Sequence, residues 1–247
     1  MSVNSSVIAH DPAALLQDWH SVASLIDHTL LSPSATRAQV VALCAEAVRY
    51  GFYSVMVNPA YVTLAAAQVH GSPVKVGTVI GFPLGANLSV TKLAEAESAA
   101  QNGAHDLDMV INVGALKSRD RVLVQTEMRS LADLAHAHGA ILKAIIETAL
   151  LSQEEKILAC ALAVEAGVDF VKTSTGFADA GATAADVVLM RGVVGLRVGV
   201  KAAGGIRTAA QFVDMLDAGA NRIGTSASVE IVRELGAPAD DRSNGSN

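Results

Sequence analysis

Cysteine is scarce in this 247-residue sequence, which contains only two, without the close spacing of a metal site. Cys44 and Cys160 each lie in an apolar stretch with helical spacing, where a free cysteine usually behaves as a small buried hydrophobe. This usage is typical of a reducing compartment. The first twenty residues contain neither the basic segment nor the continuous apolar segment of a signal peptide, so we expect a cytoplasmic protein.

The sequence also lacks an excess of positive charge and a long hydrophobic run. Its formal net charge is -6, and its arginines are scattered among acidic residues, which argues against a nucleic-acid or anionic-membrane partner. Nowhere does it contain the roughly 18 uninterrupted apolar residues that a membrane span requires. A small molecule is therefore the expected ligand.

Hydrophobic residues, in contrast, make up 51% of the chain, and charged residues 17%. This is enough apolar material for one large core, and α/β barrels often reach this length as a single domain. No linker or change in composition divides the chain. We expect one domain over residues 21–236, preceded by an N-terminal extension over 1–20 and followed by a polar C-terminal tail over 237–247.

A recurring pattern indicates that helices alternate with strands. In four places a helix-like stretch ends on a glycine, which suits the left-handed position after a helix C-terminus, and a short β-branched or apolar run follows. These glycines are Gly51, Gly103, Gly167 and Gly219. Four predicted helices also begin with a hydroxyl N-cap that is followed three residues later by an acid or a glutamine, as in a capping box. These N-caps are Thr36, Ser152, Thr183 and Thr208.

Eight strands can be recognised between the predicted helices, and they are dense in valine and isoleucine. They cover residues 24–27, 53–58, 75–80, 106–112, 141–147, 169–174, 197–202 and 221–225. Eight strands that alternate with helices are what a closed parallel (β/α)8 barrel, the TIM barrel of the α/β class, requires. A doubly wound open sheet is the alternative, although no GxGxxG motif opens its first unit.

Three of the seven lysines lie in apolar strands. The other four lie at strand starts, on helices or near turns, where a solvated ammonium group is ordinary; they are Lys75, Lys92, Lys117 and Lys156. Lys143, Lys172 and Lys201 fall on the fifth, sixth and seventh predicted strands. On consecutive barrel strands their ammonium groups would meet near the C-terminal mouth, where such barrels place their active sites. The alternative is that each is a surface lysine or pairs with a nearby acid.

A clustered lysine can acquire a free amine. The ordinary pKa of lysine is near 10.4, so only roughly one part in a few thousand is unprotonated at pH 7. Burial and a neighbouring ammonium both lower that pKa, and a neutral amine can attack a carbonyl to form a Schiff base. Asp108 lies on the fourth strand, where period-two alternation can direct it toward the lysines. It could transfer protons there, or form a structural ion pair with Lys143 or Lys201.

Glycine-containing loops predict a phosphate site at the same end of the barrel. They contain Gly204 and Gly205 after the seventh strand, Gly224 and Ser226 at the end of the eighth, and Gly176 after the sixth. Glycines let backbone N–H groups approach an anion closely, and TIM barrels frequently bind phosphate with the last two loops. Arg207 could also reach the phosphate, but it could equally pair with an acid on a neighbouring helix, so we leave it out of the predicted site.

Seven motifs closely resemble those of the deoxyribose-phosphate aldolase family, in the family's order. They are LIDHTLL, VNPAYV, VIGFPLGA, DLDMVINVGALKS, LKAIIET, FVKTSTGF and VKAAGGIRT, and the match extends from about Leu25 to Ser228. The resemblance implies a class I aldolase on a (β/α)8 barrel that reversibly cleaves 2-deoxy-D-ribose 5-phosphate to D-glyceraldehyde 3-phosphate and acetaldehyde. It implies neither a metal nor an organic cofactor. Because the family often forms dimers, we also expect a homodimer.

The resemblance implies roles for individual residues as well. Lys172, in the KTSTG motif, matches the family's Schiff-base lysine. Lys201, in the KxxGG motif, matches the lysine that perturbs this amine, and it joins Asp108, in the DMVIN motif, in proton transfer. Lys143 matches a lysine that supports the site, and Thr29 matches a threonine close to the substrate.

Three departures from the family's pattern also matter. Met56 stands where many members have a cysteine, so chemistry assigned to that thiol does not transfer. Some members end in a tyrosine that assists proton transfer, but Tyr61 is the last tyrosine here, so we expect that this aid is absent or supplied by water or another group. Ser32 replaces a common lysine, which we interpret as a surface change.

Two other functions fit the same barrel. A phosphosugar isomerase or epimerase would use Asp108 as a base and the lysines to stabilise an enediolate, but it leaves three clustered lysines with little to do. A non-catalytic phosphosugar-binding barrel is the second alternative, and the missing C-terminal tyrosine is the one feature that favours it. The fold alone does not choose among these functions.

Overall fold

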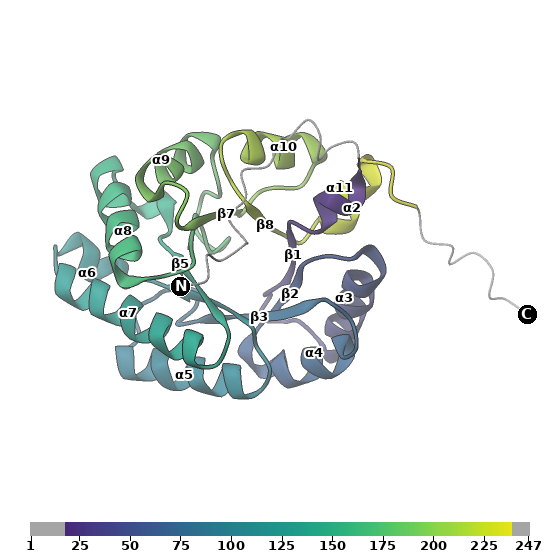
Figure 1. The fold of residues 1–247 in the computed structure, drawn as a ribbon, viewed down its shortest axis with the longest axis horizontal. Helices are drawn as coiled ribbons and strands as arrows, with labels where there is room; N and C mark the ends of the chain where they lie inside the picture. Colours follow the sequence, from purple (N-terminus) through teal and green to yellow (C-terminus); the bar gives the residue numbers. More distant parts are fainter. Residues whose placement is uncertain (1–17, 239–247) are drawn as a thin grey trace, which may run out of the picture.

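Eight parallel strands close into a barrel at the centre of the molecule, in a computed structural model that describes residues 18–238 (Figure 1). The strands are β1 (Ile26–Leu30), β2 (Ser54–Val57), β3 (Lys75–Ile80), β4 (Asp106–Val110), β5 (Ile141–Ile145), β6 (Phe170–Lys172), β7 (Gly199–Ala203) and β8 (Arg222–Thr225). Each strand pairs with the next, and β1 also pairs with β8. That last pairing confirms the (β/α)8 barrel and excludes the open doubly wound sheet.

The first strand begins two residues later than expected. Ser24, which we assigned to the strand, instead caps helix α2 (Trp19–Ala23) and donates its N–H to the preceding helical turn. Strand β1 therefore begins at Ile26 and pairs with β2 toward its C-terminal end. This shift places Thr29 inside the strand.

Helices surround the barrel and cover its outer face (Figure 1). After α2 they are α3 (Arg37–Tyr50), α4 (Val62–Val69), α5 (Ser89–Gln101), α6 (Val113–Lys117), α7 (Arg121–Ala137), α8 (Gln153–Ala166), α9 (Ala184–Val194), α10 (Ala209–Asp217) and α11 (Ser228–Glu234), with short 3-10 helices at Pro59–Tyr61 and Thr148–Leu150. The four predicted N-caps are confirmed, because each hydroxyl accepts a hydrogen bond from the N–H three residues later. Gly51 and Gly167 end α3 and α8 in the left-handed conformation, as expected.

A continuous apolar core packs around the barrel, and one lysine is unexpectedly buried beside it. Lys92, on α5, is 0% exposed. Its Nζ lies 2.8 Å from Oε2 of Glu127 on α7 and 2.8 Å from the carbonyl oxygen of Val110. The expectation of a solvated ammonium was therefore wrong for Lys92, because the neighbouring helix supplies a carboxylate and the end of β4 supplies a carbonyl.

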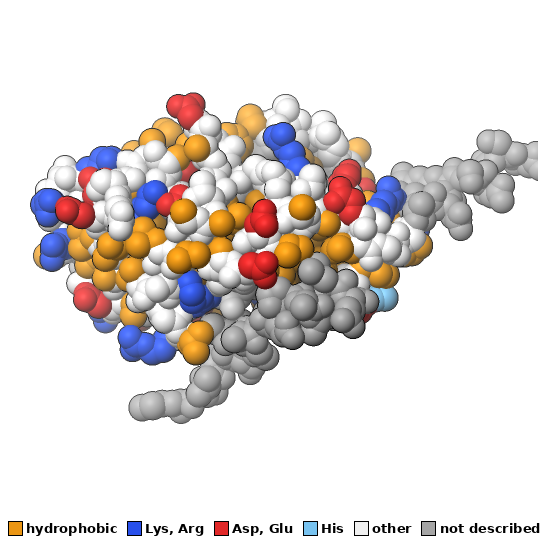
Figure 2. All heavy atoms as spheres, turned by 90° about the horizontal axis from the view of Figure 1, so that it is seen from above, with side chains coloured by type: hydrophobic (Ala, Val, Ile, Leu, Met, Phe, Trp, Pro, Cys, Tyr) orange, Lys and Arg blue, Asp and Glu red, His pale blue; other side chains and the backbone are white. Residues whose placement is uncertain are grey.

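Charged side chains of both signs are interspersed with hydrophobic ones on the face of the molecule in Figure 2. Between residues 18 and 238, the structure contains no helix that is long and apolar enough to cross a membrane. Most of the expected N-terminal extension (1–17) and C-terminal tail (239–247) lies outside the described residues, so the division of the chain at these points stays a prediction.

Candidate active site

The barrel strands bring the three strand lysines together in its interior. Lys172 on β6 is the register partner of Lys201 on β7, and Lys143 lies on the adjacent strand β5. All three side chains are buried, and Lys172 is 3% exposed as a whole residue. The alternative in which these lysines lie at the surface is therefore wrong.

Asp108 contacts all three lysines, as the alternation of β4 predicted. Its Oδ2 accepts hydrogen bonds from Lys172 Nζ at 2.9 Å and from Lys201 Nζ at 2.8 Å. Its Oδ1 lies 3.2 Å from Lys143 Nζ. Asp108 thus forms ion pairs with Lys143 and Lys201 and also contacts Lys172. It is placed for both of the roles that the sequence left open, proton transfer and a structural ion pair.

Two further carboxylates and an arginine complete this buried cluster. Asp106, two residues before Asp108 on the same strand face, accepts a hydrogen bond from Lys143. Asp27 on β1 lies 2.5 Å from Lys201 Nζ and 3.2 Å from Arg222 Nη1.

Sequence reasoning missed Asp27 and Arg222. The signal that could have found Asp27 is its spacing, because Asp27 and Thr29 share one face of a strand by period-two alternation. That signal was hidden because our predicted strand ended at Asp27.

The charges around each buried group push the pKa values of two lysines apart. Burial lowers the pKa of Lys172 to about 8; Asp108 opposes this shift, and the ammonium of Lys201 adds to it. Burial also disfavours the charged form of Lys143, but Asp106 and Asp108 outweigh it and raise that pKa above its ordinary value. Of these two lysines, Lys172 therefore provides the neutral amine more readily. With a pKa of about 8, roughly a tenth of the Lys172 side chains are unprotonated at pH 7.

Asp108 and Asp27 stay ionised, whereas burial outweighs Lys143 and raises the pKa of Asp106. Burial raises the pKa of Asp108, but the three lysines outweigh burial and hold it well below its ordinary value. Burial also raises the pKa of Asp27, but the positive charges of Lys201 and Arg222 outweigh burial and lower this pKa below its ordinary value. Asp108 is thus a carboxylate that accepts hydrogen bonds from Lys172 and Lys201 and keeps a negative charge beside them.

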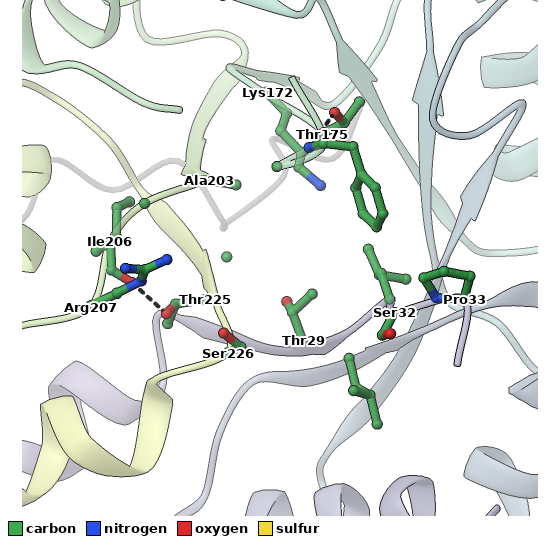
Figure 3. A pocket seen from close by; sticks show the side chains of 17 residues that line it. Thr29, Ser32, Pro33, Lys172, Thr175, Ala203, Ile206, Arg207, Thr225 and Ser226 are labelled. Carbon is green, nitrogen blue, oxygen red and sulfur yellow. Dashed lines mark hydrogen bonds between the residues drawn. The ribbon is translucent and has the colours of Figure 1, made fainter. Parts of the chain in front are cut away.

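A cavity of about 510 Å³ opens beside Lys172 at the C-terminal end of the barrel strands (Figure 3). Its lining includes every predicted phosphate-site residue together with Thr29 and Lys172: Gly176, Gly204, Gly205, Gly224 and Ser226. Figure 3 shows the amine of Lys172 directed into this space, with Thr29, Ser226 and Arg207 on other walls. Asp108, Lys143 and Lys201 belong to the barrel interior and do not line the cavity.

Close packing and backbone conformation require glycine at two positions of the cavity wall. Gly204 has φ of 91°, and the backbone of Gly181 packs so closely against it that a Cβ on Gly181 would lie 2.2 Å from the carbonyl oxygen of Gly204. A Cβ on Gly224 would lie 2.9 Å from Cε of Lys201. Gly224 therefore makes room for the lysine, a role that the sequence reading did not anticipate.

The structure also gives the positions of three residues outside the predicted site. Arg207, left out of the predicted site, lines the cavity, and so does the exposed Ser32. Ser32 is thus both a surface residue and part of the cavity wall. Met56 is fully buried and packs with Leu31 and Val79, and it does not line this cavity.

Comparisons with known proteins agree with the motifs and the fold. The model of the DeoC/LacD family aldolase matches residues 21–233. The chain is 55% identical to the deoxyribose-phosphate aldolase of Geobacillus sp. (strain WCH70) over 213 residues, which cover 86% of this chain and 95% of the relative. It is 54% identical to that of Thermococcus kodakarensis, over 88% of this chain and 97% of the relative.

A solved structure shows the same fold. The tetrameric deoxyribose phosphate aldolase from Aeropyrum pernix matches with a TM-score of 0.85 and 34% identity, covering 95% of this chain and 98% of that one. The barrel, the clustered lysines and the extent of these matches lead to one conclusion: the chain belongs to the DeoC/LacD aldolase family.

Proposed function

We propose that this protein is a class I aldolase that reversibly cleaves 2-deoxy-D-ribose 5-phosphate to D-glyceraldehyde 3-phosphate and acetaldehyde, with Lys172 as the Schiff-base residue. The observation that carries the proposal is the position of Lys172. It is buried, its Nζ lies 2.9 Å from Asp108, and it borders a cavity whose other end is formed by glycine loops. The names of the relatives supply the substrate, and the geometry supports the chemistry.

The first steps form the Schiff base. The neutral amine of Lys172 attacks the aldehyde carbon C1 of the open-chain sugar and gives a carbinolamine. Lys201, held as an ammonium between Asp27 and Asp108, protonates the departing hydroxyl, and water leaves to give the iminium ion. Asp108 carries negative charge next to that cation and stabilises it.

The iminium ion then accepts the electrons of the C2–C3 bond. Removal of the proton from the C3 hydroxyl breaks this bond, releases glyceraldehyde 3-phosphate and leaves an enamine on Lys172. Protonation of the enamine at C2 and addition of water to the resulting iminium ion release acetaldehyde and restore the amine. Asp108 and Lys201 are the nearest groups able to exchange these protons, and no step requires a metal or an organic cofactor.

The opposite end of the cavity holds the substrate's phosphate in this proposal. Gly204 and Gly205 follow β7, and Gly224 and Ser226 lie at the end of β8, where backbone N–H groups can approach an anion. Gly176, which follows β6, also lines this cavity. Arg207 places its guanidinium at the same end of the cavity (Figure 3). Thr29 lines the same cavity, and in this proposal it contacts the sugar hydroxyls.

Product analysis tests the reaction and separates it from the two alternatives. Wild type and Lys172→Ala are incubated with deoxyribose 5-phosphate, and the products are identified by NMR. An aldolase produces acetaldehyde in equal amount to glyceraldehyde 3-phosphate, and Lys172→Ala produces neither. An isomerase or epimerase produces a sugar phosphate with all five carbons, and a binding protein returns the substrate unchanged.

We also propose a cytoplasmic homodimer. The two cysteines are free and buried, which suits a reducing compartment. The solved relative from Aeropyrum pernix is described as tetrameric, and that description applies to the relative. Light scattering on the purified protein measures the assembly directly, and a monomer or tetramer would contradict the homodimer.

A further inference from the structure

His28 points outward from β1 and joins two helices to the barrel. Its neighbours Asp27 and Thr29 contact the buried cluster and the cavity, so strand alternation turns His28 to the opposite face. The imidazole is buried. Its Nε2 lies 2.9 Å from Oε2 of Glu46 on α3, and its Nδ1 lies 2.8 Å from Oγ of Ser228 at the start of α11.

Ser228 extends this link to the loops at the phosphate end of the cavity. Its hydroxyl donates to the carbonyl of Thr225 at 3.1 Å. The hydroxyl of Thr225 donates to the carbonyl of Ile206 at 2.7 Å, the dashed line between these loops in Figure 3. Thr225 and Ile206 both line the cavity. A continuous set of hydrogen bonds therefore connects His28 with the loops that follow β8 and β7.

The position of Ser228 is set by two contacts of its hydroxyl oxygen. This oxygen lies 2.8 Å from Nδ1 of His28 and 3.1 Å from the carbonyl oxygen of Thr225. Because the imidazole is buried and also contacts Glu46, its position in the barrel wall is fixed from both sides. His28 therefore holds Ser228 next to the end of β8, where the cavity loop begins.

We propose that His28 is a positioning residue for phosphate recognition, which acts through Ser228 and Thr225 on the two cavity loops. This proposal rests on the proposed function, because it takes these loops to be the ones that bind the substrate's phosphate. The links do not include Lys172 or Asp108. Loss of these hydrogen bonds therefore weakens recognition of the phosphate and leaves the Schiff-base chemistry in place.

Two substitutions of His28 separate its two contacts. Asparagine carries its amide close to the position of Nδ1, so His28→Asn can still donate to Ser228. Glutamine carries its amide close to the position of Nε2, so His28→Gln can still contact Glu46 and loses the bond to Ser228. Ser228→Ala removes the next link. Thr78→Val is the matched control, because it removes a buried hydroxyl that donates to the carbonyl of Val57, away from the cavity.

The measurement is kcat/KM for deoxyribose 5-phosphate and for unphosphorylated deoxyribose. In Ser228→Ala and His28→Gln we expect the ratio of these constants to fall about tenfold, as for the loss of one aligned hydrogen bond. The constant for deoxyribose itself should change little. His28→Asn and Thr78→Val should keep the wild-type ratio. An unchanged ratio in both Ser228→Ala and His28→Gln, or an equal fall in Thr78→Val, would overturn the positioning role.

Calorimetric titration with inorganic phosphate distinguishes a failure of this role from a failure of the proposed function. If wild type cleaves neither sugar but binds phosphate more tightly than Ser228→Ala, the aldolase proposal fails and the positioning role stands. If wild type cleaves the phosphorylated sugar while both proteins bind phosphate equally, the aldolase proposal stands and the positioning role is overturned. A wild type that shows neither phosphate binding nor a preference for the phosphorylated sugar overturns the positioning role as well.

Discussion

At the scale of single residues, burial gives Lys172 its chemistry. Its pKa is lowered to about 8, first by burial and then by the ammonium of Lys201, against the opposing charge of Asp108. The amine attacks only when neutral, so kcat/KM should rise with pH through about 8 and then level off. The measurement is a pH profile of kcat/KM for deoxyribose 5-phosphate.

The neighbouring ammonium predicts how this profile shifts in a variant. Lys201→Met removes a positive charge and frees Asp108 to bond more fully to Lys172, and both changes raise the pKa of Lys172. The midpoint of the profile should therefore move to higher pH, at a lower overall rate. A midpoint that stays in place or moves to lower pH would contradict this account of the cluster.

Sequence patterns found the lysines and Asp108 but not their full surroundings. Three lysines in apolar strands are unusual enough to be recognised locally, and period-two alternation directs Asp108 toward them. Asp27 reaches Lys201 only because β1 pairs with β8 and closes the barrel. These two strands lie some two hundred positions apart in the sequence. No local pattern reports such a pairing.

At the scale of secondary-structure elements, Lys92 joins α5 to α7 and to the end of β4. Its ammonium is buried against Glu127, so Lys92→Ala leaves a buried carboxylate without its cation. We expect a loss of about 3–5 kcal/mol in the free energy of unfolding, measured with urea. Lys117→Ala is the control, because Lys117 pairs with Glu155 at an exposed site, and that loss should be much smaller. Equal losses of stability in the two variants would contradict the assignment of Lys92 and Glu127 as a stabilising buried ion pair.

Element boundaries were predictable where the signal lies in neighbouring residues. The caps at Thr36 and Ser152 and the glycines at Gly51 and Gly167 mark helix ends through bonds within one turn. The start of β1 was missed because Ser24 caps the short helix α2, which has little sequence pattern of its own. The burial of Lys92 was missed for another reason, since its partner lies on a different helix.

At the scale of the whole molecule, the barrel and every residue of the proposed mechanism lie within 18–238. A protein trimmed to residues 18–238 should therefore fold and retain at least about a tenth of the full chain's kcat, which steady-state assays of both proteins measure. Circular dichroism of the trimmed protein provides the control for folding. A folded but inactive trimmed protein would show that the terminal segments contribute to catalysis.

Alternation of helices and strands predicted the fold class, but it could not report closure. Closure depends on the pairing of β1 with β8, which joins the two ends of the barrel sequence. The cavity likewise depends on closure, because its walls come from β1, β6, β7 and β8. The glycine loops could therefore be predicted one by one, while their assembly around one space required the structure.

Borohydride trapping identifies the lysine that forms the Schiff base. Wild type and Lys172→Ala are treated with deoxyribose 5-phosphate and sodium borohydride, and their peptides are analysed by mass spectrometry. Lys117→Ala, which removes an exposed lysine that does not line the cavity, controls for a general loss of lysine chemistry and should give the wild-type adduct. We predict a reduced adduct on the peptide that contains Lys172 in wild type and none on that peptide in Lys172→Ala. Cleavage of the substrate without any adduct, or an adduct on another lysine in wild type, would rule out Lys172 as the Schiff-base residue.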